Sequence, residues 1–230
     1  MKNFWKIFFL AFLCMASPVK ADEASRRLAP SIVKALSPIL HDGDIVFVRI
    51  PYYVLKQVAR TTGSWESHVG MVFRNPKGEW EIAESTVPIS RYTTLQSFFK
   101  RTEKGQFAVM RLKRKLSQKD VAALRQEADK RMGKFYSLGF NKDSRHQFCS
   151  KFVYDVYLNA LGVKIGQEQT FRELFEENPE APVDFWKLWF GGQIPWDRKT
   201  ITTTSIYRSP LLWEVAESEP YRITSRPLKN

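Results

Sequence analysis

A cysteine at the start of one predicted helix has the surroundings that thiol chemistry needs. Cys149 lies where apolar residues begin to recur with a helical period, and Gly162 marks the end of that period. The first turn of a helix carries unpaired backbone N–H groups and the positive end of the helix dipole, which lower the pKa of a thiol. The resulting thiolate attacks carbonyl carbon. The alternative is that Cys149 is a small buried hydrophobic residue.

A histidine and a glutamate lie on two earlier segments that alternate like strands. Residues 68–73 and 79–84 predict a hairpin, with Pro and Gly in the turn between them. If the hairpin is centred on Pro76, His68 directly faces Glu84, with Cβ atoms about 5 Å apart. The carboxylate then fixes the tautomer of the imidazole and favours its charged form.

The alternative is a purely structural role, in which His68 only begins one strand of the hairpin and Glu84 only ends the other. Gly70 lies on the same predicted face as both residues. Glycine inside a strand often marks close approach by another chain segment or a ligand. This position therefore favours a functional role for the face.

The first 21 residues predict a cleavable signal peptide. A positively charged start is followed by an apolar run at 7–16, and small residues precede a cut after Ala21. The apolar run is too short to span a bilayer comfortably. We therefore expect residues 22–230 to form a single exported domain, periplasmic or secreted.

Export changes what the cysteine implies. Removal of the signal peptide also removes Cys14 and leaves Cys149 as the only cysteine. A single thiol cannot form an internal disulfide, and an unpaired thiol is a liability in an oxidising compartment. This context favours a chemical role for Cys149.

The composition indicates a folded, basic domain. Apolar residues make up 43% and aromatic residues 14%, which excludes a disordered chain. Loss of the three signal-peptide lysines lowers the formal charge from +12 to +9. Basic domains often bind nucleic acid, but export favours peripheral contact with an anionic envelope surface, such as cell-wall polymer or lipid headgroups. The alternative is that the charge only keeps the surface soluble.

No cofactor is expected, and no metal site either. His41 and His146 have no partners at metal-ligand spacing. The segment 185–196 is rich in tryptophan and is either a platform for sugar rings or lipid chains, or part of the core.

Other predicted elements are a helical lead-in at 24–40 broken by Pro30 and Pro38, strands at 45–50, 107–112 and 211–215, and helices at 52–60 and from Ser117 to about Met132.

Several motifs together resemble the circularly permuted papain-fold hydrolases, the YiiX/YebB-like branch of the NlpC-type cysteine peptidase superfamily. The resemblance implies an α+β, papain-like fold in which an antiparallel sheet packs on helices and the histidine precedes the cysteine. It covers about residues 42–215. The motifs are Gly43-Asp44-Ile45-Val46-Phe47, Ser67-His68-Val69-Gly70-Met71, Ala83-Glu84-Ser85, Phe148-Cys149-Ser150-Lys151-Phe152-Val153, and the downstream Phe185-Trp186-Lys187-Leu188-Trp189-Phe190 and Ile194-Pro195-Trp196-Asp197-Arg198-Lys199-Thr200.

The resemblance also implies roles for single residues. Cys149 matches the nucleophile, His68 the catalytic histidine and Glu84 the third polar residue of the family. Relatives often carry Tyr-Asp before the cysteine. Here Tyr136 keeps the tyrosine, a candidate for oxyanion or substrate contact, while Ser137 replaces the acid.

Three functions follow from these features. The first is an exported thiol hydrolase that cleaves an amide bond in cell-wall peptides through a Cys-His-Glu triad and an acyl-enzyme. The second is a hydrolase or acyltransferase acting on lipid esters or thioesters, with the segment 185–196 as the wall for the acyl chain. The third is a non-catalytic envelope-binding domain that keeps the fold.

Overall fold

The computed structural model describes residues 23–218 and 222–223. The predicted signal peptide, residues 1–21, lies outside the described residues. Within the described ranges, no helix combines the length and the apolar character needed to cross a membrane.

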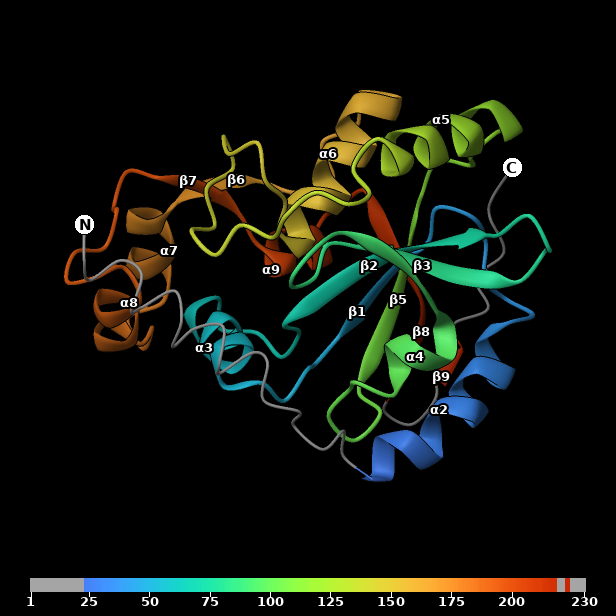
Figure 1. Cartoon of the computed structure of the whole chain (residues 1–230), viewed down its shortest axis with the longest axis horizontal. Coiled ribbons are helices and arrows are strands. Elements are labelled where there is room, and N and C mark those ends of the chain that lie inside the picture. The colour runs from blue at the N-terminus through green and yellow to red at the C-terminus, as the bar shows by residue number, and fades with distance from the viewer. Residues whose placement is uncertain (1–22, 219–221, 224–230) are drawn as a thin grey trace.

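A seven-stranded sheet forms the centre of the molecule, and every pair of neighbouring strands in it is antiparallel (Figure 1). Its order is β4-β3-β2-β1-β5-β8-β9, and a separate pair, β6-β7, lies outside it. The predicted α+β class is confirmed. The strands are β1 (Ile45–Val48), β2 (His68–Arg74), β3 (Trp80–Glu84), β4 (Arg91–Thr94), β5 (Phe107–Leu112), β6 (Glu168–Thr170), β7 (Lys199–Ile201), β8 (Leu212–Glu217) and β9 (Arg222–Ile223).

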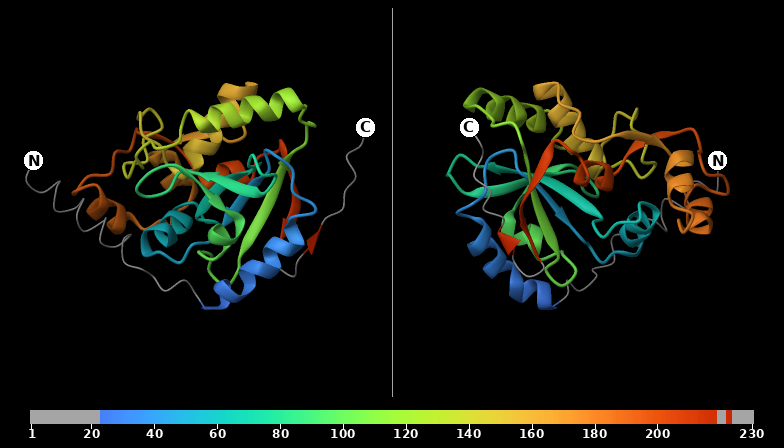
Figure 2. Two further views of the ribbon diagram at one scale, coloured as in Figure 1. Left: turned by 45° about the vertical axis from the view of Figure 1, so that its right-hand side comes forward. Right: turned by 180° about the vertical axis from the view of Figure 1, so that it is seen from behind.

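Helices cover both faces of the sheet and one of its ends. Helices α5 and α6 lie along one face and α2 and α4 along the other, while α3, α7 and α8 gather beside one end (Figures 1 and 2). The short α9 packs against α6. The helices are α2 (Glu23–Leu36), α3 (Tyr53–Thr61), α4 (Leu95–Phe99), α5 (Gln118–Asp129), α6 (Cys149–Leu161), α7 (Phe171–Glu177), α8 (Val183–Trp189) and α9 (Thr203–Tyr207).

The strand β1 shows why the sheet has a core on each face. Ile45 and Phe47 point into the cluster that contains α6, whereas Val46 and Val48 point into the cluster that contains α2 and α4. All four side chains are buried. Strands covered on both faces read as continuous apolar runs, because alternate side chains enter different cores.

The predicted break at Pro30 is wrong. Helix α2 continues through Pro30 and ends at Leu36, before Pro38. Proline removes one backbone hydrogen bond from a helix. Here Ala29 and Ile32, on either side of Pro30, are buried in the same core cluster as Leu36. This continuous apolar face holds the helix together.

Two other predictions fit the structure closely. Strand β5 has the predicted bounds. Helix α5 begins at the predicted cap: Ser117 Oγ accepts from Asp120 N–H at 3.1 Å, and Asp120 Oδ2 accepts from Ser117 N–H at 2.9 Å. This reciprocal pair is a capping box. The helix ends at Asp129, three residues before the predicted Met132.

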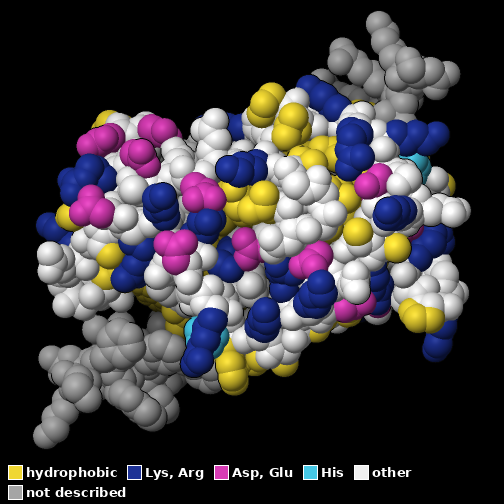
Figure 3. Space-filling model, turned by 90° about the horizontal axis from the view of Figure 1, so that it is seen from above, with side chains coloured by type: hydrophobic (Ala, Val, Ile, Leu, Met, Phe, Trp, Pro, Cys, Tyr) yellow, Lys and Arg dark blue, Asp and Glu magenta, His cyan; other side chains and the backbone are white. Residues whose placement is uncertain are grey.

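Basic side chains are spread across the face seen in Figure 3 rather than gathered in one patch. Acidic side chains are interspersed among them. On this face, the excess of Lys and Arg over Asp and Glu is therefore distributed, which fits a role in solubility.

Candidate active site

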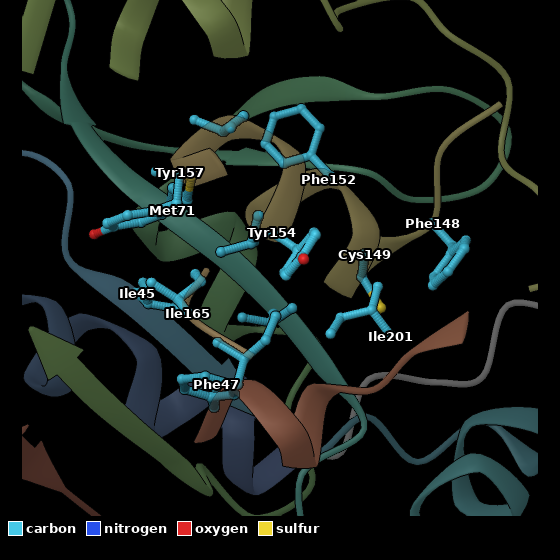
Figure 4. Close-up of a cluster of buried hydrophobic side chains, with 14 of the residues drawn as sticks. Ile45, Phe47, Met71, Phe148, Cys149, Phe152, Tyr154, Tyr157, Ile165 and Ile201 are labelled. Atoms are coloured by element: carbon cyan, nitrogen blue, oxygen red, sulfur yellow. The ribbon is translucent and has the colours of Figure 1, made fainter. Parts of the chain in front are cut away.

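Cys149 is the first residue of α6 and is buried, with 5% of its surface exposed. The preceding Phe148 is extended (φ −136°, ψ 165°), and no side chain caps the helix there. Gly162 ends α6 in the left-handed conformation (φ 67°). Figure 4 shows Cys149 at the mouth of the helix, beside Ile201. The predicted position of the thiol in the first turn is confirmed, and the helix leaves its N-terminal N–H groups free for other partners.

His68 and Glu84 form a buried hydrogen bond of 2.7 Å between Nε2 and Oε2. The expected direct opposition of the two residues is nevertheless wrong. Arg74 pairs with Trp80, and extending this register places Gly70, not His68, opposite Glu84. His68 is a diagonal neighbour on the same face, a spacing of about 7–8 Å between Cα atoms that long side chains bridge.

The two-residue difference in register comes from the turn. Asn75 Oδ1 accepts from the backbone N–H groups of Lys77 (2.9 Å) and Glu79 (3.0 Å). Gly78 adopts a φ of +79°, which only glycine enters without strain. The turn is therefore centred on Lys77 rather than Pro76. Because the shift is even, the predicted face survives.

Gly70 permits the packing that supports His68. A Cβ at this position would lie 2.4 Å from Ile82 Cγ2 and 3.4 Å from Phe98 Cε2. The Phe98 ring in turn lies 5.7 Å from the ring of His68. The close approach expected at Gly70 is thus made by neighbouring side chains of the chain itself.

Two arginines share the charge of Glu84. Arg101 Nη2 donates to both carboxylate oxygens at 2.8 Å, and Arg91 Nε lies 3.6 Å from Oε1. Burial by itself raises the pKa of Glu84, but Arg101 and His68 together lower it to about 2. Glu84 is therefore already ionised across the pH range in which the imidazole gains or loses its proton.

The imidazole and the thiol shift each other toward the charged forms. Burial alone lowers the pKa of His68, but hydrogen bonds to Cys149 and Glu84, and the charges on both, raise it above its ordinary value. Burial alone raises the pKa of Cys149, but the hydrogen bond and charge of His68 lower it, helped by Tyr136 and the N–H of Ser150. The geometry favours a thiolate–imidazolium pair.

Tyr136 lies beside the sulfur, with its hydroxyl oxygen 3.9 Å from Cys149 Sγ. The backbone N–H of Cys149 also interacts with this hydroxyl. Burial and the neighbouring thiolate raise the pKa of Tyr136, so the hydroxyl keeps its proton. Its backbone is held in place because Tyr136 N–H donates to Pro88 O at 2.9 Å. Ser137, which follows, donates its N–H to Gln147 O at 2.6 Å.

A narrow cavity of about 40 Å³ reaches Cys149. One side is closed by α8 and α3, which are joined where Trp186 Nε1 donates to Thr61 Oγ1 at 2.6 Å. Within the aromatic segment 185–196, Trp186 is buried in the core whereas Leu188 is 73% exposed. The other apolar residues lining the cavity are Leu55, Val58, Phe140, Phe148, Phe171, Leu174 and Ile201.

The structure brings together all four site residues expected from the sequence: Cys149, His68, Glu84 and Tyr136. Sequence reasoning missed Arg101, which follows the unpredicted short helix α4. No local pattern marks it, because its partner lies 17 residues away. Among the described residues, no group of three or more His, Cys, Asp or Glu side chains is placed to hold a metal ion.

A thiol at a helix mouth, with its histidine on a strand that precedes it in the chain, is the arrangement of a permuted papain-like cysteine hydrolase. The chain belongs to the permuted papain-like amidase family, described as the YaeF/YiiX or C92 family, whose model matches residues 39–216. It is thus an amide hydrolase of papain fold.

Two relatives support this assignment. YiiX of Escherichia coli strain K12, itself described as uncharacterised, is 31% identical over 179 residues, which cover 77% of this chain and 87% of YiiX. The crystal structure of the metalloprotein YiiX from Escherichia coli O157:H7 superposes with a TM-score of 0.71 at 30% identity, covering 77% of this chain and 97% of that one.

Proposed function

We propose that this protein is an exported thiol amidase that cleaves an amide bond in cell-wall peptides through Cys149, His68 and Glu84. The observation that carries the proposal is the buried chain of contacts from Glu84 through His68 to the Cys149 thiol. Export is supported by the signal-peptide pattern of residues 1–21. In an oxidising compartment an unpaired thiol is a liability, which favours a chemical role for Cys149.

In the proposed reaction, the Cys149 thiolate attacks the amide carbonyl and forms a tetrahedral oxyanion. The N–H of Cys149 and the hydroxyl of Tyr136, which interact with each other, are the two donors assigned to this oxygen in the scheme. The His68 imidazolium gives its proton to the leaving nitrogen as the C–N bond breaks, which leaves a thioester on the sulfur. Water then attacks the thioester with His68 as base, releasing the carboxylic acid and restoring the thiol.

Glu84 has a supporting role in this scheme. Its carboxylate accepts from His68 Nε2, which leaves the other ring nitrogen for the thiol and stabilises the positive charge on the ring. Arg101 keeps Glu84 ionised and fixed. Glu84 therefore orients the imidazole and does not itself exchange protons.

The test is turnover of purified peptidoglycan fragments by the chain from residue 22 onward, followed by mass spectrometry of the products. Cys149→Ala and His68→Ala are expected to abolish cleavage while circular dichroism and the melting temperature show a folded protein. Lys187→Ala, an exposed cation on α8, serves as the matched control with wild-type cleavage. Undiminished cleavage by either site variant would overturn the proposal.

A second function, hydrolysis or transfer of lipid acyl groups, is favoured by the apolar wall of the Cys149 cavity. Phe140, Phe148 and Trp186 line it. This function requires the cavity to widen, because about 40 Å³ has room for only a few water-sized groups and not for an acyl chain. Release of fatty acid from envelope lipids, with no cleavage of peptidoglycan fragments, would favour it over the amidase.

A further inference from the structure

A second, larger cavity of about 610 Å³ borders the narrow one at Cys149. The two cavities share four lining residues: Thr61, Thr62, Leu174 and Thr202. The larger cavity extends from this shared boundary along α7 and α9. It is therefore placed to take a part of the substrate that continues beyond the reacting carbonyl.

Most residues that line the larger cavity have polar side chains, and two of them are cations, Lys164 and Arg208. Among residues 23–218 and 222–223, neither of them enters an ion pair. Arg208 Nη2 makes one long contact of 3.4 Å with Gly63 O. The acid in the lining, Glu177, accepts from Gln169 Nε2 at 2.8 Å. Because the lining holds two cations, which have no ion-pair partner among the described residues, and one acid, positive charge is in excess there.

The position of His68 decides which half of the substrate this cavity receives. The leaving nitrogen takes its proton from the imidazole, so the leaving half lies on the His68 side of the sulfur. His68 lines neither cavity, although Cys149 lines the narrow one. Cavities that Cys149 reaches but His68 does not line suit the acyl half, which stays attached to Cys149 as the thioester.

The distance from the boundary shared by the two cavities to Arg208 fits a short peptide. Arg208 lies six residues beyond Thr202, and α9 joins them, so a helical rise of about 1.5 Å per residue separates them by about 9 Å. An extended peptide covers that distance in about three residues, at about 3.3 Å each. A glutamate at the second residue of the peptide, counted back from the reacting carbonyl, reaches Arg208 with its side chain.

We propose, building on the amidase function, that the acyl half of the substrate is a peptide whose carboxylate binds Lys164 and Arg208. Guanidinium and ammonium groups recognise carboxylates by charge-assisted hydrogen bonds. The narrow cavity next to the sulfur, about 40 Å³, admits a methyl-sized side chain at the residue under attack. Alanine therefore suits that position.

The test compares two fluorogenic amides that differ in one functional group, acetyl-Glu-Ala-aminomethylcoumarin and acetyl-Gln-Ala-aminomethylcoumarin. The wild type is expected to prefer the Glu substrate by about tenfold in kcat/KM, mostly through KM, and to lose the preference in 0.5 M salt. Lys164→Ala/Arg208→Ala is expected to treat both substrates equally. Lys187→Ala, outside both cavities, is the control and keeps the preference.

Binding separates this inference from the proposed function. Titration calorimetry of Cys149→Ala measures the affinity for acetyl-Glu-Ala-amide and acetyl-Gln-Ala-amide without turnover. Tighter binding of the Glu peptide by Cys149→Ala, lost when Lys164 and Arg208 are also replaced by alanine, supports the carboxylate site. This result holds even if the wild type cleaves neither amide. Failure to cleave would count against the proposed amidase function but not against the carboxylate site. Equal binding of the two peptides, or a Glu preference that survives removal of both cations, would overturn the inference whatever the wild type cleaves.

Discussion

His68 Nε2 lies 2.7 Å from Glu84 Oε2, although the two residues are diagonal rather than opposite neighbours across β2 and β3. The diagonal arrangement leaves Glu84 room for a second partner, and Arg101 occupies it with contacts of 2.8 Å to both oxygens. One buried carboxylate therefore serves both the fold and the site. Its charge stabilises the imidazolium and holds the segment after α4 against the sheet.

Glu84 should make the folded state sensitive to acid. Its pKa is about 2 in the folded protein, against an ordinary value of 4.5. A depressed pKa gives stability that is present above the unfolded value and is lost as the pH falls from about 4.5 toward 2. The difference between these two pKa values corresponds to about 3 kcal/mol of stability.

Urea unfolding of the wild type and Glu84→Gln between about pH 6 and pH 3 measures this contribution. Other carboxylates titrate in both proteins, so the difference between the two curves is the quantity of interest. We expect the stability gap between wild type and variant to shrink as the pH falls. A gap that stays constant across this range would show that Glu84 is not held ionised by its partners.

Tyr136→Phe should slow the chemical step. Loss of one donor to a developing oxyanion costs about 10²–10³ in kcat in enzymes of this kind of chemistry, with little change in KM. Tyr154→Phe is the matched control, because the Tyr154 hydroxyl donates to Glu168 at 2.9 Å, away from the sulfur. Steady-state kinetics on the peptidoglycan fragment that the wild type cleaves gives kcat for both variants. Equal kcat values for the two variants would remove Tyr136 from the mechanism.

Gly70→Ala should destabilise the protein by about 1–3 kcal/mol, the usual cost of overpacking a core. The new methyl group would lie 2.4 Å from Ile82 Cγ2, inside the sheet. Gly139→Ala is the control, since the nearest atom to its added Cβ is Arg198 Nη1 at 3.4 Å. Chemical denaturation measures both. A Gly70→Ala protein as stable as Gly139→Ala would mean that the packing around Phe98 and His68 is looser than described.

Local patterns were enough to predict the elements that carry the site. The helical period after Phe148 placed Cys149 in a first turn, and strand alternation put His68 and Glu84 on one face. The register of the hairpin needed more than alternation, because the side chain of Asn75 sets the turn. Only the pairing geometry revealed the two-residue shift.

Contacts between distant segments were beyond such patterns. Arg101 reaches Glu84 only because α4 folds back on β3, and Trp186 closes the cavity only because α8 meets α3. Neither residue has a neighbour in sequence that points to its partner. The continuity of α2 through Pro30 is also a tertiary effect, since the buried face on both sides outweighs the local preference.

The central claim, a thiolate stabilised by His68, is tested most directly by the pH dependence of Cys149 alkylation. Cys149 is the only cysteine in residues 22–230, so iodoacetamide reports on it alone. We expect the midpoint of the rate–pH curve to lie well below the ordinary thiol value of about 8.5, and to rise toward that value in His68→Ala. The midpoint, unlike the rate itself, does not depend on how easily the reagent reaches the sulfur. A wild-type midpoint near the ordinary value, or one that is unchanged in His68→Ala, would contradict the account.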